Sequence, residues 1–178
     1  MTQPALFAVE DGEHSAVTQG ATSSNLDTGN SHAIEFFYAA TRRGWDIYAP
    51  VFKDGATADC AGTKPGLPSI LFQNKTGTID RARPGYSICT ACGGGAKRPY
   101  AKHDFDILVA YLPDRKQFAF FTYDQVGGRK TVRYNPDHHF RPDNWELLDQ
   151  VAAIKAQESL TPKTTDVPPL TVQMSKSA

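Results

Sequence analysis

The sequence lacks any apolar run close to the roughly 20 residues that a membrane-spanning helix needs, although 40% of its 178 residues are hydrophobic. Its first fifteen residues include no lysine or arginine and soon reach acidic residues, so they do not resemble a secretory signal. The three cysteines are an odd number, which argues against a disulfide framework. We therefore expect a protein without a membrane segment, in a reducing, cytoplasmic setting.

The chain also lacks net charge, with 19 basic and 19 acidic side chains, but these charges are unevenly distributed. Residues 1–30 carry a net charge of −4, residues 31–145 carry +5 and residues 146–178 carry −1. A basic body with an acidic arm permits binding to phosphate groups, which the balanced total alone would not suggest.

Composition divides the chain into one central domain and two tails. Residues 1–29 are rich in Ser, Thr, Gly and Gln, and residues 161–178 are rich in Pro, Thr and Ser. Neither segment shows a sustained apolar period, so we predict that both tails are disordered. Residues 30–160 are then expected to form a single domain.

The central region has helical periodicity at its two ends and strand-like segments between them. We expect the first helix to be capped by Asn30 or Ser31 and closed at Gly44, and the last to be capped by Asp143 or Asn144. This order predicts an α+β fold in which helices flank a mixed sheet. The expected strands span residues 45–49, 57–60, 69–76, 105–111, 117–123 and 131–134.

The segment Ser69–Thr76 carries the most informative polar residues. Strand alternation places Gln73 and Lys75 on one face, beside Leu71, where core building alone would not require them. Asp59 lies near the end of the candidate strand at residues 57–60. A hairpin between the two strands would bring its carboxylate alongside Gln73.

This combination suits metal-assisted hydrolysis of a phosphodiester. Hard cations prefer oxygen ligands, here the Asp59 carboxylate, the Gln73 side-chain carbonyl and the Asn74 backbone carbonyl. Lys75 would orient or deprotonate the attacking water, because the positive charge of a nearby metal lowers the pKa of the lysine. Glu35 would hold a second metal, or a water on the first, from the helix side.

With that helix acid upstream, the run ATADC…SILFQNKT resembles the PD-(D/E)XK nuclease superfamily over roughly residues 31–123. It is most similar to the group I intron-type homing endonucleases, in which Gln can occupy the acidic position of the (D/E)XK half. The resemblance assigns Asp59, Gln73 and Lys75 to the motif and Glu35 to the helix acid. Ala58 stands where the nominal Pro would be.

The resemblance implies a PD-(D/E)XK-like core made of a helix, a three-stranded antiparallel unit, a second helix and a further strand. It also implies Mg²⁺-dependent cleavage of double-stranded DNA, with Mn²⁺ as a substitute ion. Since each DNA strand needs its own active site, such nucleases commonly act as symmetric homo-oligomers. An apolar stripe of Trp145, Leu148 and Val151 would serve that association or cap the core.

Basic residues continue through the insertion at 77–102 and beyond it. They are interleaved with Tyr86, Tyr100, Tyr134 and Phe140, a pattern typical of nucleic-acid surfaces. The predicted DNA-binding residues are Arg81, Arg83, Lys97, Arg98, Lys102, Arg129, Lys130, Arg133 and Arg141.

Two other patterns leave alternatives open. Cys89 and Cys92 form one CxxC, but a second CxxC is missing. We therefore expect free thiols in a loop rather than a Zn²⁺ site. His138, His139 and Asn144 resemble part of an HNH nuclease motif, whose alternative interpretation is a polar loop before the last helix. A catalytically silent DNA-binding module that keeps the nuclease fold is the third possibility.

Overall fold

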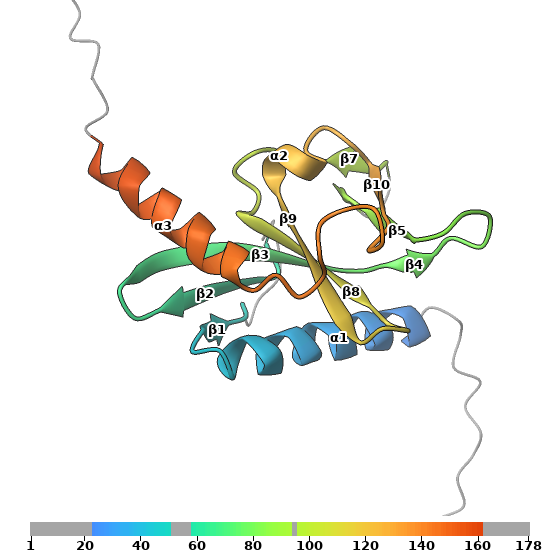
Figure 1. Cartoon of the computed structure of the whole chain (residues 1–178), viewed down its shortest axis with the longest axis horizontal. Helices are drawn as coiled ribbons and strands as arrows, with labels where there is room; N and C mark the ends of the chain where they lie inside the picture. Colours follow the sequence, from blue (N-terminus) through green and yellow to red (C-terminus); the bar gives the residue numbers. More distant parts are fainter. Residues whose placement is uncertain (1–22, 51–57, 94–95, 162–178) are drawn as a thin grey trace, which may run out of the picture.

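The structure, a computed structural model, describes residues 23–50, 58–93 and 96–161 (Figure 1). The tails predicted to be disordered lie outside the described residues from 1 to 22 and from 162 to 178. Residues 23–29, which were assigned to the disordered arm, begin helix α1 (Ser23–Thr41) instead. This run holds no proline, and an isolated glycine is tolerated in a helix, so Asn30 and Ser31 lie inside α1 rather than capping it.

A five-stranded mixed sheet forms the centre of the fold, in the order β1–β2–β3–β8–β9. Neighbouring strands are antiparallel except β3 and β8, which are parallel. The predicted α+β class with a mixed sheet is thus confirmed. The strands are β1 (Asp46–Tyr48), β2 (Cys60–Lys64), β3 (Leu67–Thr76), β8 (Ile107–Leu112) and β9 (Gln117–Thr122).

The crossover between the parallel strands β3 and β8 differs from the expected helix. Its described residues form strands, because frequent glycine and proline and alternating Tyr and Ile disfavour a helix. They build a two-stranded β6–β7 sheet and, together with β10 from after β9, a three-stranded sheet in the order β10–β5–β4. These strands are β4 (Thr78–Ile79), β5 (Tyr86–Cys89), β6 (Ala91–Cys92), β7 (Arg98–Pro99) and β10 (Thr131–Tyr134).

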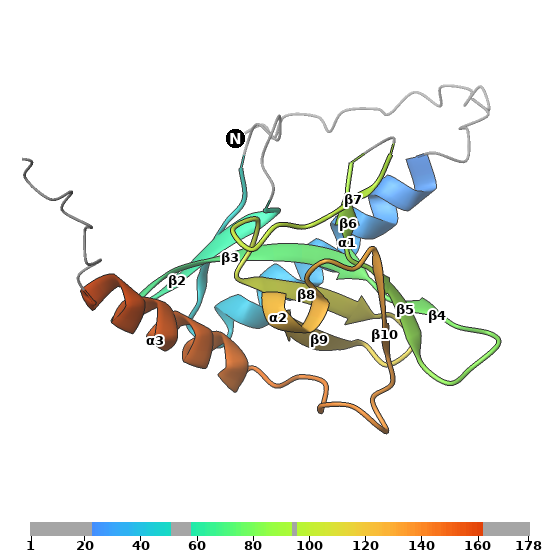
Figure 2. The ribbon, with the colours of Figure 1, turned by 90° about the horizontal axis from the view of Figure 1, so that it is seen from above.

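Each face of the central sheet has its own apolar core (Figures 1 and 2). Helices α1 and α3 (Glu146–Leu160) cover one face through a cluster that includes Phe36, Phe72 and Leu148. The small sheets and the short helix α2 (Tyr123–Val126) cover the other, around Leu108 and Tyr134. Figure 2 shows α3 and the β4–β5 hairpin extending at opposite ends of the molecule.

The start of α3 corrects the expected cap and decides between the two roles expected for the apolar stripe. Asp143 does not cap the helix: its carboxylate Oδ1 accepts a hydrogen bond from the Phe118 N–H at 2.9 Å, and its own N–H donates to the Phe118 carbonyl at 2.7 Å. Trp145 occupies the N-cap without a side-chain cap bond and stacks on Phe36, with ring centres 6.0 Å apart. Leu148 is fully buried and Trp145 and Val151 pack against the core, so of the two roles expected for this stripe the structure shows the core-capping one.

Strand β2 begins at Cys60, where the predicted strand 57–60 ends, and residues 51–57 lie outside the described part of the chain. Gly62 lies within β2 at a close approach of three side chains. A Cβ there would lie 2.6 Å from a Phe72 ring carbon, 3.0 Å from Ile47 Cδ1 and 3.3 Å from a Trp45 ring carbon. None of the described helices is long and apolar enough to cross a bilayer.

Gly62→Ala should destabilise the fold by about 1–3 kcal/mol, because the added methyl overpacks this corner of the core. Gly29→Ala is the matched control: no heavy atom lies within 4 Å of a Cβ on this helical glycine. That variant should gain about 0.5–1 kcal/mol from helix propensity. Urea unfolding measures both changes, and equal stabilities for the two variants would contradict the packing described for β2.

Candidate active site

Strand alternation in β3 separates its apolar and polar residues as the sequence predicts. Ile70 and Phe72 enter the core beneath α1 and α3. Gln73 and Lys75 take the opposite face, where the parallel register pairs them with Leu108 and Ala110 of β8. Gln73 is only 4% exposed, and a buried amide is costly unless it is hydrogen-bonded.

Asp59 supplies that hydrogen bond. The antiparallel β2–β3 register sets Cys60 opposite Phe72, and the Asp59 N–H donates to the Phe72 carbonyl at 2.9 Å. Its carboxylate Oδ2 then accepts hydrogen bonds from the Gln73 side-chain amide and, at 2.8 Å, from the Asn74 N–H. The predicted approach of Asp59 to Gln73 is therefore present, and it is fixed by backbone pairing.

Asp59, Gln73 and Lys75 together line two cavities that share this wall. One, of about 550 Å³, opens toward α1 and is also lined by Asn30, Ala33, Ile34 and Phe37. The other, of about 540 Å³, is closed by the crossover segment, including Cys89, Cys92, Lys97, Arg98 and Tyr100. Both volumes lie in the range of about 300–1,000 Å³ that is usual for ligand sites.

Lys75 has an unusual environment for a lysine. Burial lowers the pKa of its ammonium group, the charges of Asp59, Cys89 and Cys92 raise that pKa, and the Lys97 cation lowers it. Lys75 Nζ also lies 5.4 Å from the centre of the Tyr100 ring, a cation–π contact. The net effect is a lysine that releases its proton more readily than an exposed one.

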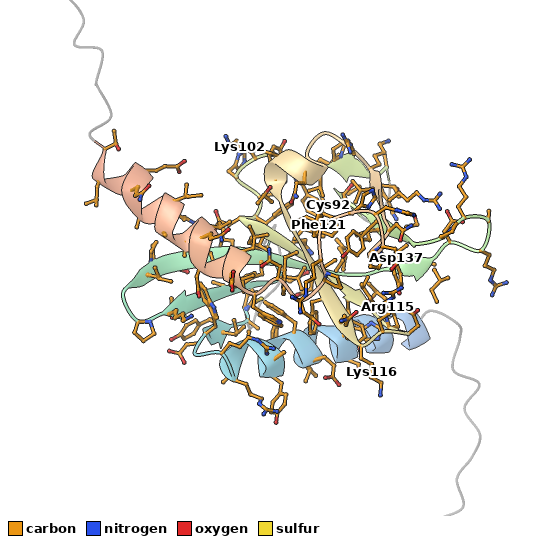
Figure 3. The ribbon with its side chains drawn as sticks, viewed as in Figure 1. Cys92, Lys102, Arg115, Lys116, Phe121 and Asp137 are labelled. Atoms are coloured by element: carbon orange, nitrogen blue, oxygen red, sulfur yellow. The ribbon has the colours of Figure 1, made fainter. Side chains whose placement is uncertain are left out.

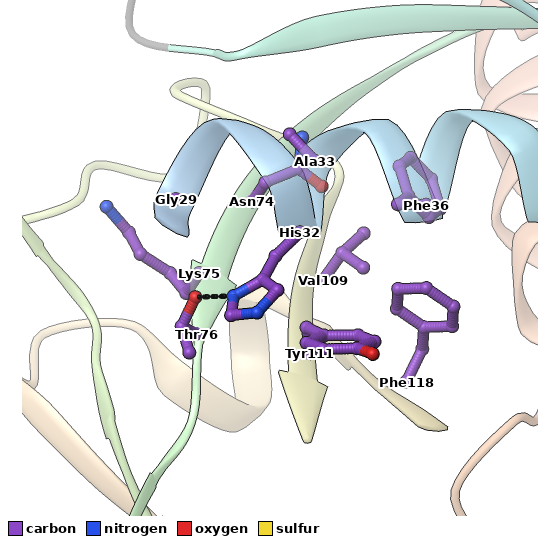
Figure 4. A pocket seen from close by; sticks show the side chains of 10 residues that line it. All are labelled: Gly29, His32, Ala33, Phe36, Asn74, Lys75, Thr76, Val109, Tyr111 and Phe118. Atoms are coloured by element: carbon purple, nitrogen blue, oxygen red, sulfur yellow. Dashed lines mark hydrogen bonds between the residues drawn. The ribbon is translucent and has the colours of Figure 1, made fainter. Parts of the chain in front are cut away.

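Glu35 does not join this cluster. Its side chain is exposed on α1, and it lines neither cavity at Asp59. Burial lowers the pKa of His32, and the charge of Glu35 raises it. The Glu35 carboxylate therefore influences His32 rather than the Asp59 cluster. Figure 4 shows His32 reaching from α1 to Thr76, with a hydrogen bond of 2.8 Å, beside the Tyr111 ring.

Asn30 is the polar α1 residue that does line the cavity beside Asp59, and sequence reasoning missed it. Its assignment as a helix cap concealed this role. The signal was present in the sequence, because Asn30, Ala33, Ile34 and Phe37 follow the spacing of one helix face. A residue's place on that face depends on where the helix begins.

The donor atoms at Asp59 fit a hard divalent cation by their chemistry. One carboxylate, the Gln73 amide and the Asn74 backbone carbonyl offer oxygen, and turning the Gln73 amide over would exchange its donor for its carbonyl oxygen. Within the described residues, no group of three His, Cys, Asp or Glu side chains is placed to hold a metal. A cation here would therefore rely on a single carboxylate and neutral carbonyls.

All nine predicted DNA-binding residues are exposed. Figure 3 shows Lys102 at the periphery of the molecule. Arg98 is held by the buried Asp104 at 3.3 Å, and Arg133 by Asp80 at 3.0 Å. The interleaved aromatics are not part of this surface: Tyr86, Tyr100 and Tyr134 are buried and Phe140 packs against the second core, because the crossover needs its own apolar interior.

The HNH pattern is not assembled into a cluster. His138 and His139 are exposed in the loop between β10 and α3. The His139 ring nitrogen Nδ1 accepts a hydrogen bond from the Asn135 N–H at 2.8 Å, which closes this loop on itself. His139 thus stabilises the conformation of its own loop.

Comparisons with known proteins place the fold. No protein-family model matches the chain, and no curated protein matches it. Among solved structures, the bacterial homing endonuclease I-Ssp6803I is similar with a TM-score of 0.58 and 20% sequence identity, over 80% of this chain and 100% of that one. MepB gives a TM-score of 0.37 and 13% identity, over 70% of this chain and 92% of that one. The first likeness shows that the chain has the fold of a homing endonuclease.

The charges around Lys75 predict opposite shifts of its pKa in two variants. Lys97→Gln removes a like charge and should raise the pKa, whereas Asp59→Asn removes an opposite charge and should lower it further. Lys102→Gln is the control, because Lys102 lies outside the cavity. NMR titration of isotope-labelled lysine measures all three. Shifts of the same sign in the two cavity variants would refute this arrangement.

Proposed function

We propose that the chain is an Mg²⁺-dependent DNA endonuclease of the PD-(D/E)XK type, with Asp59, Gln73 and Lys75 as its active site. The observation that carries this proposal is the meeting of a carboxylate, an amide and a half-buried lysine on one wall of a cavity. The fold supports it, since a similar solved structure is that of a bacterial homing endonuclease. Site-specific, homing-type cleavage is the corresponding proposal for the substrate.

The roles follow from charge and position. Asp59 provides the full negative charge for Mg²⁺, with the Gln73 and Asn74 carbonyls as neutral ligands. Bound Mg²⁺ would supply Lewis-acid polarisation of a phosphoryl oxygen. Lys75 holds and releases a proton at Nζ, which suits it to orient or deprotonate the attacking water, because burial lowers its pKa. Glu35 lies outside this set, so we do not assign it a metal-binding role.

The exposed basic residues are proposed to bind the DNA backbone. Arg81 and Arg83 lie on the projecting β4–β5 hairpin, whereas Lys97 and Arg98 line the cavity that contains Lys75. Cations at the cavity and at a distance from it would set the register of a duplex across the active site. Contacts to phosphate carry no sequence information, so base recognition needs other groups.

A catalytically silent DNA-binding module is the second candidate function. The observation that favours it is the single carboxylate at the cluster, since Gln73 contributes only a partial charge to a cation. Both candidates bind DNA, and only the first cleaves it.

Asp59→Asn and Lys75→Gln should each reduce Mg²⁺-dependent cleavage of plasmid DNA by at least about a hundredfold, because each removes a group that acts on the reaction. The matched controls are Asp124→Asn and Lys116→Gln, which make the same chemical changes at exposed positions outside the proposed site and DNA surface. Circular dichroism should show the same fold for all four. Full activity in either site variant would remove that residue from the active site, and an inactive wild-type protein would favour the silent module.

Binding to DNA should weaken with salt, because basic side chains release counterions from the phosphates. The double variant Arg81→Gln/Arg83→Gln should lower the slope of log affinity against log salt by about 0.9 for each phosphate that the protein no longer neutralises. Arg115→Gln/Lys116→Gln is the matched control in the exposed turn between β8 and β9 (Figure 3). Filter binding without Mg²⁺ measures the slopes, and an equal decrease in both variants would contradict the proposed surface.

A further inference from the structure

The crossover brings two cysteine thiols to the cavity that contains Lys75. Cys89 ends β5 and Cys92 lies in β6, and both side chains line this cavity. Lys75 and Tyr100 line the same cavity, so the two cysteines share one space with them. Figure 3 shows Cys92 on the side of the small sheets. The proposed DNA hydrolysis uses neither thiol.

The surroundings of the two sulfurs differ from those of the third cysteine. The Lys97 ammonium donates to Cys89 Sγ at 3.6 Å, and Cys92 Sγ lies 3.7 Å from the Arg98 carbonyl oxygen. Both thiols are partly exposed, whereas Cys60 is 2% exposed in the core. Oxidants reach partly exposed sulfurs and not buried ones, and the Lys97 ammonium at Cys89 Sγ is placed to stabilise negative charge on that sulfur as it reacts. Cys89 and Cys92 are therefore the reactive thiols of the described chain.

The backbone between them is firmly held. The Thr90 side-chain hydroxyl donates to the Arg129 carbonyl at 2.8 Å, and the Thr90 N–H donates to the Lys130 carbonyl at 2.9 Å. Thr90 and Ala91 are both buried. A change at the sulfurs would thus be taken up by the neighbouring wall residues, Lys97 and Arg98, rather than by the fold.

We propose that Cys89 and Cys92 form a reversible oxidation site for hydrogen peroxide, at which an intramolecular disulfide replaces the two thiols and changes the wall of the Lys75 cavity. The Cys89 thiolate attacks one peroxide oxygen, the O–O bond breaks, and hydroxide leaves and is protonated to water. The Cys92 thiolate then attacks the resulting sulfenic sulfur, forms the S–S bond and expels a second hydroxide, which also becomes water. Two thiols are oxidised and one peroxide is reduced to two waters.

The consequence for cleavage rests on the proposed function. The disulfide leaves Lys97 with a weaker, uncharged sulfur acceptor at Cys89 and removes the S–H that Cys92 directs at the Arg98 carbonyl. Lys97 lines the cavity with Lys75, so its release should slow the cleavage of DNA. A thiol reductant should restore the rate, because disulfides at exposed sites are readily reduced.

Peptide mass spectrometry of the full chain after peroxide treatment tests the oxidation itself. The expected product is a Cys89–Cys92 linkage that has lost two hydrogens, with Cys60 still a free thiol. In Cys92→Ser the Cys89 sulfenic acid should persist and be trapped by dimedone, and Lys97→Gln should slow its formation several-fold. Lys102→Gln is the matched control and should react as the wild-type protein does.

Equal dimedone trapping in the wild-type protein and Cys92→Ser, or oxidation of Cys60 as fast as that of Cys89, would overturn the proposal. Cleavage is measured separately on reduced, oxidised and re-reduced protein, with Cys89→Ser as a variant that should not respond to peroxide. Cleavage that is equally fast in reduced and oxidised protein would overturn the effect on the cavity. A disulfide in a protein that never cleaves DNA would refute the proposed function alone.

Discussion

The parallel pairing of β3 with β8 is the constraint on which the rest of the structure depends. Parallel neighbours cannot be joined by a tight turn, so the chain must cross over between Gly77 and Asp106. That crossover covers the face of β3 opposite α1 and α3. Without it, Gln73 and Lys75 would face water as ordinary polar positions of a strand. With it, they form the wall of a cavity, and burial lowers the pKa of Lys75.

The start of β8 shows how this pairing is held. Asp106 accepts a hydrogen bond from the Leu71 N–H at 2.7 Å, donates its own N–H to the Leu71 carbonyl at 2.9 Å, and pairs with Lys155 of α3 at 2.6 Å. The same strand position therefore joins β3, β8 and α3. Asp59 performs a comparable task at the other edge of β3, so the acid proposed for the cation also maintains the geometry of the site.

Much of the fold followed from short-range patterns in the sequence. Alternation within a strand is set locally, so the shared face of Gln73 and Lys75 was predictable, as was the hairpin approach of Asp59. The position of Glu35 was not, because a helix can turn about its axis until its apolar face is buried, and α1 began earlier than its apparent caps. Tyr100 was misassigned to the surface because its burial depends on a crossover whose strands pair over long range.

The central proposal is that Asp59 and Gln73 hold Mg²⁺, and the affinity of the protein for the ion tests it most directly. An amide oxygen carries only a partial charge, so Gln73→Glu should tighten Mg²⁺ binding, while Asp59→Asn should abolish it. Isothermal titration of the wild-type protein and both variants, with Asp124→Asn as control, gives the affinities without any need for cleavage. Unchanged Mg²⁺ affinity in Gln73→Glu and Asp59→Asn would contradict the account.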